Sequence, residues 1–218
     1  QNYKFILVPL ILLLIPCYLV IQQPDLGTSI LIAGTGIIII WLAGLNIKYF
    51  VYSGLLLIVS LPFAVSLLKP YQKSRILTFF NPDRDPLGAG YQIIQSKIAI
   101  GSGGFFGKGF LKGTQSYLEF LPEKHTDFIF TLFSEEFGFL GSIMLLLLYI
   151  LLIYRIISIG FYAKSFFSKL FCFGFASAIF LYIFVNISMV LGLLPIVGAP
   201  LPIMSYGGSS MLSIMLGL

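Results

Sequence analysis

A short segment in the middle of the chain gathers the side chains best suited to acid–base chemistry. In LEFLPEKHTDFIF, two glutamates, a histidine and an aspartate precede a long apolar run, namely Glu119, Glu123, His125 and Asp127. Carboxylates and imidazoles can transfer protons, and charges at the edge of a membrane-length apolar run commonly mark function. Another interpretation is structural, with Thr126 or Asp127 capping the helix that follows. Spacing alone leaves both interpretations open.

A glycine-rich stretch lies just upstream, at 101–113, and reads GSGGFFGKGFLKG. Glycine lets the backbone approach a ligand closely and turn its N–H groups toward an anion. The spacing of known nucleotide motifs fails, because a dinucleotide loop needs glycine where the chain has Phe106, and no Ser or Thr follows the Gly-Lys pair. Two alternatives stay open: a flexible turn between interfacial segments, or a site for an anionic lipid head group served by Lys97, Lys108 and Lys112.

The composition places these residues in a membrane protein. Hydrophobic residues make up 58% of the chain and charged residues 10%, whereas soluble proteins carry about 25% charged residues. The net charge is +5, but the basic residues lie apart among apolar runs, so we expect no nucleic-acid partner. A lone histidine and two isolated cysteines, Cys17 and Cys172, exclude a dedicated zinc site and predict two buried free thiols.

Apolar runs of about 20 residues are long enough to cross a bilayer as helices. We predict an all-α, polytopic transmembrane bundle, one membrane domain over 1–218, with about six spans at 5–21, 29–45, 50–68, 128–154, 170–194 and 205–218. Prolines inside the runs favour a multi-helix bundle, in which neighbours satisfy the carbonyls that proline frees. The chain lacks an initiator Met and its last run is short, so we expect a piece of a longer protein.

The distribution of Lys and Arg predicts the orientation. One set of short connections carries Lys4, Lys48, Arg155, Lys164 and Lys169, whereas the connections at 22–28 and 195–204 carry none. The first set is therefore expected in the cytoplasm and the long loop 69–127 outside. Within that loop, Tyr91, Ile94 and Ile98 recur at helical spacing and predict an interfacial amphipathic helix.

Three motifs resemble the SEDS family (shape, elongation, division, sporulation), with its rod-shape branch nearest. They are QPDLGTS at 23–29, the segment from DPLGAGYQ to HTDFIF at 85–130, and PLPIMSYGGSS at 200–210. The resemblance covers essentially the whole chain. It implies a ten-span peptidoglycan glycosyltransferase of the bacterial cytoplasmic (inner) membrane that polymerises lipid II during cell elongation. The implied partners are a class B penicillin-binding protein and other elongation-complex proteins. The family's first four spans, with its Gln-Pro-Ser-Glu motif, are missing.

Carried over by position, the resemblance implies that Asp127 is the catalytic residue. The glycine-rich motif falls on 101–104 and the Ser-Tyr-Gly-Gly motif on 205–208. With the nearby charges, the predicted substrate-binding residues are Lys97, Gly101, Ser102, Gly103, Gly104, Lys108, Lys112, Glu123, His125, Ser205, Tyr206 and Gly207.

The implied chemistry inverts an α-linked sugar pyrophosphate into a β-1,4 glycan, for which one general base suffices. The departing pyrophosphate needs a positive field, from lysines or a divalent cation; no other cofactor is evident. Two alternatives have other consequences. A lipid II flippase would use Glu135 and Glu136, expected to face the bundle interior, and a non-catalytic scaffold would only support its transpeptidase.

Overall fold

The computed structural model describes residues 4–23, 25–67, 70–85, 88–114 and 125–218. The described residues form α-helices and one short 3-10 helix, without strands. The elements are α1 (Lys4–Gln22), α2 (Leu26–Leu42), α3 (Ile47–Leu67), α4 (Pro70–Phe80), η1 (Pro82–Arg84), α5 (Ala89–Gly103), α7 (Ile129–Tyr162), α8 (Phe166–Val190) and α9 (Gly208–Gly217). The predicted all-α class is confirmed.

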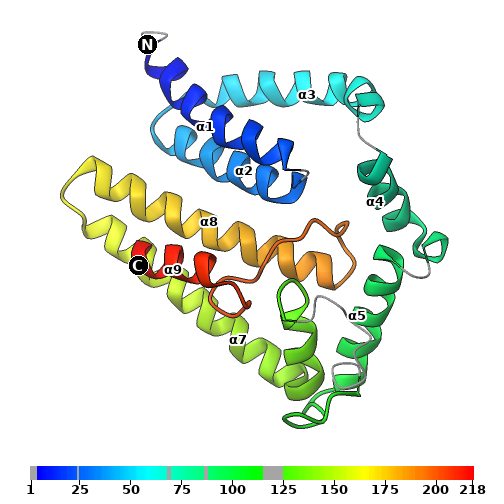
Figure 1. Cartoon of the computed structure of the whole chain (residues 1–218). Helices are drawn as coiled ribbons and strands as arrows, with labels where there is room; N and C mark the ends of the chain where they lie inside the picture. Colours follow the sequence, from blue (N-terminus) through cyan, green and yellow to red (C-terminus); the bar gives the residue numbers. More distant parts are fainter. Residues whose placement is uncertain (1–3, 24, 68–69, 86–87, 115–124) are drawn as a thin grey trace.

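The apolar helices pack side by side in the order α1, α2, α8, α7 (Figure 1). Helix α5 packs against the first part of α7 and also touches α8, and α4 continues from it through η1. Helix α3 runs apart from this row in Figure 1, and its described apolar side chains, such as Leu56 and Val59, are mostly exposed. The row of helices is the scaffold, and α4 and α5 lie at one end of it.

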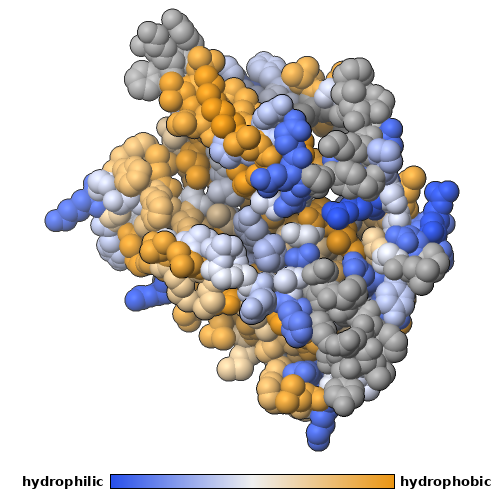
Figure 2. All heavy atoms as spheres, viewed as in Figure 1, coloured by the Kyte–Doolittle hydropathy of each residue, from blue (hydrophilic) through white to orange (hydrophobic). Residues whose placement is uncertain are grey.

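Exposed apolar side chains identify lipid as the surrounding medium of these helices. Within the described part of the chain, α7 and α8 are long and apolar enough to cross a membrane, and α1, α2, α3 and α9 contribute shorter apolar stretches. Figure 2 shows apolar residues over α1 and along α7, and hydrophilic residues toward α4 and α5. The predicted polytopic membrane protein agrees with this distribution.

Two helix boundaries differ from the predicted spans. Helix α7 continues to Tyr162 instead of ending near 154, and α8 already begins at Phe166. No proline interrupts this region, and Ser165 caps α8 by accepting a hydrogen bond from the Ser168 N–H at 3.0 Å. Arg155 therefore lies inside a helix, where a long basic side chain can extend toward water from an apolar surface.

The basic short connections lie at the same end of the row. In Figure 1 the start of α1, the α2–α3 connection and the α7–α8 connection are on the left, whereas the α1–α2 connection, the end of α8 and α5 are on the right. This arrangement is the one that the orientation hypothesis requires.

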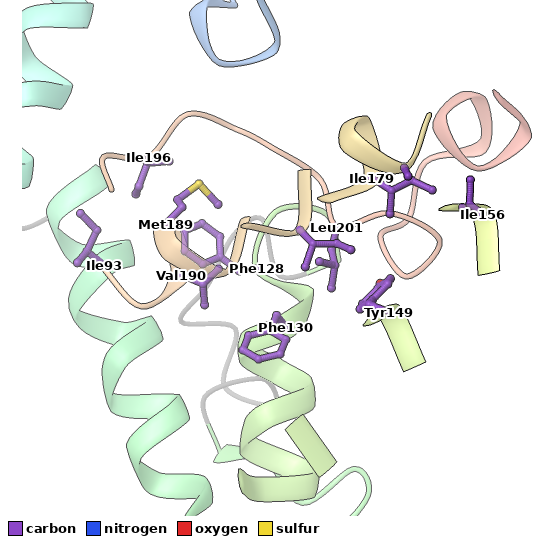
Figure 3. Packing of buried hydrophobic residues seen from close by; sticks show 12 residues of the cluster. Ile93, Phe128, Phe130, Tyr149, Ile156, Ile179, Met189, Val190, Ile196 and Leu201 are labelled. Atoms are coloured by element: carbon purple, nitrogen blue, oxygen red, sulfur yellow. The ribbon is translucent and has the colours of Figure 1, made fainter. Parts of the chain in front are cut away.

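The buried apolar core runs along the contact between α7 and α8 and reaches α5 at one end. Figure 3 shows Ile93 from α5, Phe128 before α7, Met189 and Val190 from α8, and Ile196 from the segment after α8 converging there. On α5, Ile93, Ser96 and Ala99 are buried against the rest of the protein, whereas Ile98 is 47% exposed. An exposed apolar side chain is compatible with an interfacial helix, which stays a prediction.

Candidate functional site

The turn that carries Asp127 lies directly before α7. The N-cap residue of α7 is Phe128, and no side chain supplies a cap hydrogen bond there. Neither Thr126 nor Asp127 occupies the N-cap position itself, because both lie in the turn that precedes it. Phe128 itself is buried in the core, which fixes the turn at its helical side.

The main chain of this turn is held at three successive carbonyls. The N–H of Tyr206 donates to the His125 carbonyl at 2.9 Å, and the Ser205 hydroxyl donates to the Thr126 carbonyl at 2.7 Å. The amide nitrogen of Asn186 donates to the Asp127 carbonyl at 2.8 Å. The third motif of the sequence therefore holds the second, across a large sequence separation.

The segment after α8 brings the side chain of Asp127 and two basic residues to one region. A Cβ built at Gly198 would lie 3.5 Å from Oδ2 of Asp127. The Arg75 guanidinium donates to the Ile196 carbonyl at 3.2 Å, and a Cβ at Gly192 would meet the end of the Lys97 side chain. The loop from 192 to 198 thus has a carboxylate at one end and cationic side chains along its length.

A hollow of about 600 Å³ opens beside the turn and is lined by His125, Ile129, Ser205, Tyr206 and Gly207, among others. Tyr206 is 84% exposed, and His125 is also exposed. The Ser205 hydroxyl is buried, and besides its bond to Thr126 it accepts the Leu201 N–H at 2.6 Å. Ser205 consequently supports the wall of the hollow, while His125 and Tyr206 present side chains at its surface.

The glycine-rich loop is bound to a break in α7. At Gly138 the φ angle is +66° and the helix is interrupted. In a continuous helix the N–H groups of 139 and 140 would bond the carbonyls of 135 and 136. Here these N–H groups bond the carbonyls of 104 and 105, at 2.9 and 3.1 Å, and the freed carbonyls accept from the N–H groups of 108 and 109, at 3.0 and 2.9 Å. The loop thus takes the place of the missing helical partners, and we call this exchange of main-chain hydrogen bonds the splice.

This splice occupies three N–H groups of the loop that could otherwise face an anion. The N–H groups of Gly107, Lys108 and Gly109 all bond protein carbonyls. A Cβ at Gly107 would overlap the Glu136 carbonyl, so this part of the loop packs directly on α7. Gly107 has φ of +81°, a conformation that costs other residues about 1–2 kcal/mol. Glycine serves close packing here.

An ion pair lies beneath the loop. Lys108 Nζ lies 2.7 Å from Oε1 of Glu135, whose side chain is fully buried, while that of Lys108 is 27% exposed. The same oxygen accepts from Thr114 at 3.1 Å and lies 3.5 Å from the Ser102 hydroxyl. Glu135 faces the interior as predicted, but Glu136 is only half-buried.

The QPDLGTS motif forms a helix cap. Asp25 is the N-cap residue of α2, with Oδ1 accepting the Thr28 N–H at 3.0 Å and Oδ2 accepting the Thr28 hydroxyl at 2.6 Å. Gly27 lies so close to Val197 that a Cβ would overlap its carbonyl. The motif therefore supports the segment after α8.

The structure thus separates the predicted site residues into groups. His125, Ser205, Tyr206 and Gly207 line the hollow, and Asp127 lies in the same turn as His125, with its carbonyl bonded by Asn186. Another group lies at or near the α7 break, comprising Gly101, Ser102, Gly103, Gly104 and Lys108. Lys97 packs at Gly192, Lys112 lies near the end of the glycine-rich loop, and Glu123 lies outside the described residues.

Two residues of this region were missed in the sequence. Asn186 had one available signal, an amide in the middle of an otherwise apolar helix, and Arg75 had none beyond its charge. Both thiols are free, as predicted, although Cys172 is only half-buried. In the part of the chain that the structure describes, no three His, Cys, Asp or Glu side chains gather as metal ligands would.

Comparisons with known proteins show which family the chain resembles. The family model described as cell cycle protein, FtsW/RodA/SpoVE, matches residues 1–218. The peptidoglycan glycosyltransferase MrdB of Escherichia coli K12 is 50% identical over 211 residues, covering 96% of this chain and 57% of MrdB. The stage V sporulation protein E of Bacillus subtilis is 42% identical over 207 residues, covering 94% of this chain and 56% of that protein. The chain therefore spans little more than half the length of these relatives.

Solved structures are also similar over the whole chain. One, from work on the structural coordination of polymerization and crosslinking by a peptidoglycan synthase complex, has a TM-score of 0.79 and 35% identity, with 60% of its chain covered. Another, a mutant of the rod shape determining protein RodA of Thermus thermophilus, has a TM-score of 0.63 and 25% identity, with 55% covered. Since the family model matches every residue, the chain belongs to the FtsW/RodA/SpoVE (SEDS) family of cell cycle proteins.

Proposed function

We propose that the full-length protein is a peptidoglycan glycosyltransferase that polymerises lipid II into β-1,4 glycan strands, with Asp127 as general base. The observation that carries this proposal is the fixation of the Asp127 turn, at three carbonyls, beside an open hollow. A base must be held within hydrogen-bond reach of the hydroxyl that it deprotonates. The three carbonyls of the turn are held by hydrogen bonds, and His125 at its start lines the hollow. The names of the relatives, peptidoglycan glycosyltransferases among them, support the same activity.

The reaction consists of one displacement. The 4-hydroxyl of the acceptor sugar attacks the anomeric carbon of the donor, the bond to the pyrophosphate oxygen breaks, and the hydroxyl proton passes to the Asp127 carboxylate. Attack on the face opposite the α-linked pyrophosphate gives the β product. His125 and Tyr206 line the hollow and are available to contact the sugars.

The departing pyrophosphate requires positive charge rather than a proton. We assign this role to Lys97 and Lys112, because Lys108 is paired with Glu135. Arg75 contacts the same segment as Lys97, the loop from 192 to 198, because its guanidinium donates a hydrogen bond to the Ile196 carbonyl. A divalent cation arriving with the pyrophosphate is the alternative source of charge.

We place the protein in the bacterial inner membrane with loop 69–127 outside, acting in elongation beside a class B penicillin-binding protein. The peptidoglycan synthase complex among the similar structures supports a partner of that kind. Other proteins of the elongation complex are expected around this pair.

The decisive experiment incubates the purified full-length protein and its transpeptidase partner with lipid II in detergent. We expect glycan chains from the wild type and none from Asp127→Asn. Because detergent offers no bilayer to cross, product there separates the enzyme from a flippase. Translocation in liposomes without polymer, or equal polymerisation by Asp127→Asn, would contradict the proposal.

A further inference from the structure

Asn186 is a fully buried amide in an apolar helix, α8. A buried polar group without hydrogen bonds costs about 1–3 kcal/mol, so its bonding partners indicate why it is there. Its Nδ2 lies 2.8 Å from the Asp127 carbonyl and 2.6 Å from the Ala199 carbonyl. Since both neighbours are acceptors, the amide nitrogen must face them, and its two hydrogens are both used.

These two bonds join the turn before α7 to the segment after α8. Both joined residues lie at or next to the Asp127 carboxylate. Asp127 carries it, and Ala199 follows Gly198, which lies beside Oδ2 of Asp127. The Asn186 side chain therefore sets the distance between the turn that carries the carboxylate and the segment at Gly198 and Ala199. Ser205 adds a second link at the neighbouring carbonyl of Thr126.

We infer that Asn186 is a positioning residue for Asp127 in glycan polymerisation. This inference rests on the proposed function and deepens it. In the structure Asn186 contacts main-chain carbonyls behind the turn and is absent from the lining of the hollow. Its loss should therefore misplace the base without removing a substrate contact. Displacing a catalytic group by about 1 Å can cost about 10²-fold in rate.

Two variants of the full-length protein, in complex with its transpeptidase, test this role. Asn186→Leu keeps the approximate shape and removes both donors, and Asn186→Asp keeps the shape and leaves at most one O–H donor. The matched control is Ser96→Ala. Ser96 is also fully buried, and its hydroxyl links α5 to α8 through the Val190 carbonyl at 2.8 Å, but it does not touch the turn.

We expect both Asn186 variants to lower kcat for lipid II polymerisation by about tenfold or more, with KM within about twofold of the wild type. The Ser96→Ala variant should lose a similar amount of thermal stability and keep kcat within about twofold. Rates are taken per folded complex, and if Asn186→Leu does not purify, Asn186→Asp decides alone.

The possible failures are distinguishable. If Asp127→Asn abolishes polymerisation while the Asn186 variants keep the wild-type kcat, or fall only in parallel with Ser96→Ala, the positioning role is overturned and the proposed function stands. If the wild-type complex makes no glycan, or Asp127→Asn is fully active, the proposed function itself is overturned.

Discussion

The first stretch of α7 has a break in regular structure at each end, and the two breaks are resolved differently. At Gly138 the glycine-rich loop supplies and receives the main-chain hydrogen bonds that the helix gave up, and the Lys108–Glu135 pair lies beneath it. At the turn before Phe128 the main-chain carbonyls are also bonded, but the exposed His125 side chain and Tyr206 line an open hollow.

The comparison distinguishes polar groups that hold the fold together from polar groups that lie beside an open hollow. Buried backbone groups must find partners in both places, because an unpaired group in an apolar medium is costly. At the break, the charges of Lys108 and Glu135 also pair with each other inside the protein. At the turn, the Ser205 and Asn186 side chains and the Tyr206 N–H bond main-chain carbonyls, and the turn borders an open hollow. We therefore assign chemistry to the turn and architecture to the break.

The largest expected effect tests the turn. Asp127→Asn should lower the polymerisation rate by about 10² to 10⁴, the range for loss of a general base, because a carboxamide cannot accept the acceptor proton. Its thermal unfolding should stay close to that of the wild type, since Asn has nearly the same shape. His125→Ala on the same background is the control for an alternative base. A larger rate loss in His125→Ala than in Asp127→Asn would move the base to the imidazole.

The ion pair at the break gives the next effect, on stability. Lys108→Met should lower the free energy of unfolding by about 3 kcal/mol, at the lower end for a broken buried pair because Lys108 is partly exposed. The double variant Lys108→Met with Glu135→Leu should recover most of this loss, since no buried charge then remains unpaired. A double-mutant cycle by denaturation in detergent measures the coupling. A loss of lipid II affinity at unchanged stability would return Lys108 to the substrate site.

A smaller effect is expected from the splice itself. Gly107→Ala should cost about 2 kcal/mol, from a positive φ angle and from displacement of the Glu136 carbonyl. Gly101→Ala is the matched control, because nothing lies within 4 Å of a Cβ there and alanine favours the helix by about 0.5–1 kcal/mol. Melting temperatures of the two variants give the comparison. Equal melting temperatures would show that the loop is not spliced into α7 in solution.

The sequence predicted the fold better than it predicted the roles of the polar residues. Apolar runs and basic connections are long-range patterns, so the all-helical membrane bundle and the common side of the basic connections could be read from them. The face of α5 that packs inside the protein could not be read from them, because it carries small residues such as Ala99 beside Ile93. The break at Gly138 also escaped prediction, since its hydrogen-bond partners come from a distant loop.

The grouping of the site depended on tertiary contacts as well. The order of the motifs predicted that His125, Asp127 and Ser205 lie on the outer side. It did not predict that Ser205 bonds the Thr126 carbonyl. Asn186 looked like one polar residue in an apolar run, and only its two acceptors give it a role. Charge alone grouped Lys108 with Lys97, whereas the structure pairs Lys108 with Glu135.

The smallest expected effect concerns this last distinction. Lys97 lies against Gly192, on the loop that leads toward Asp127, and its side chain is exposed. A charge about 4 Å from a phosphate in water contributes about 1 kcal/mol, so Lys97→Gln should weaken lipid II binding by about fivefold at low salt. The loss should nearly disappear at about 1 M salt, where the Debye length is about 3 Å.

The control is Lys164→Gln, which removes a charge from the opposite end of the helix row, between α7 and α8. Its binding curve should match the wild type at every salt concentration. Measuring lipid II affinity against ionic strength for both variants compares one lysine near the turn with one far from it. If the two curves coincide, Lys97 contributes no field to the pyrophosphate. The charge would then come from a divalent cation or from parts of the full-length protein beyond this chain.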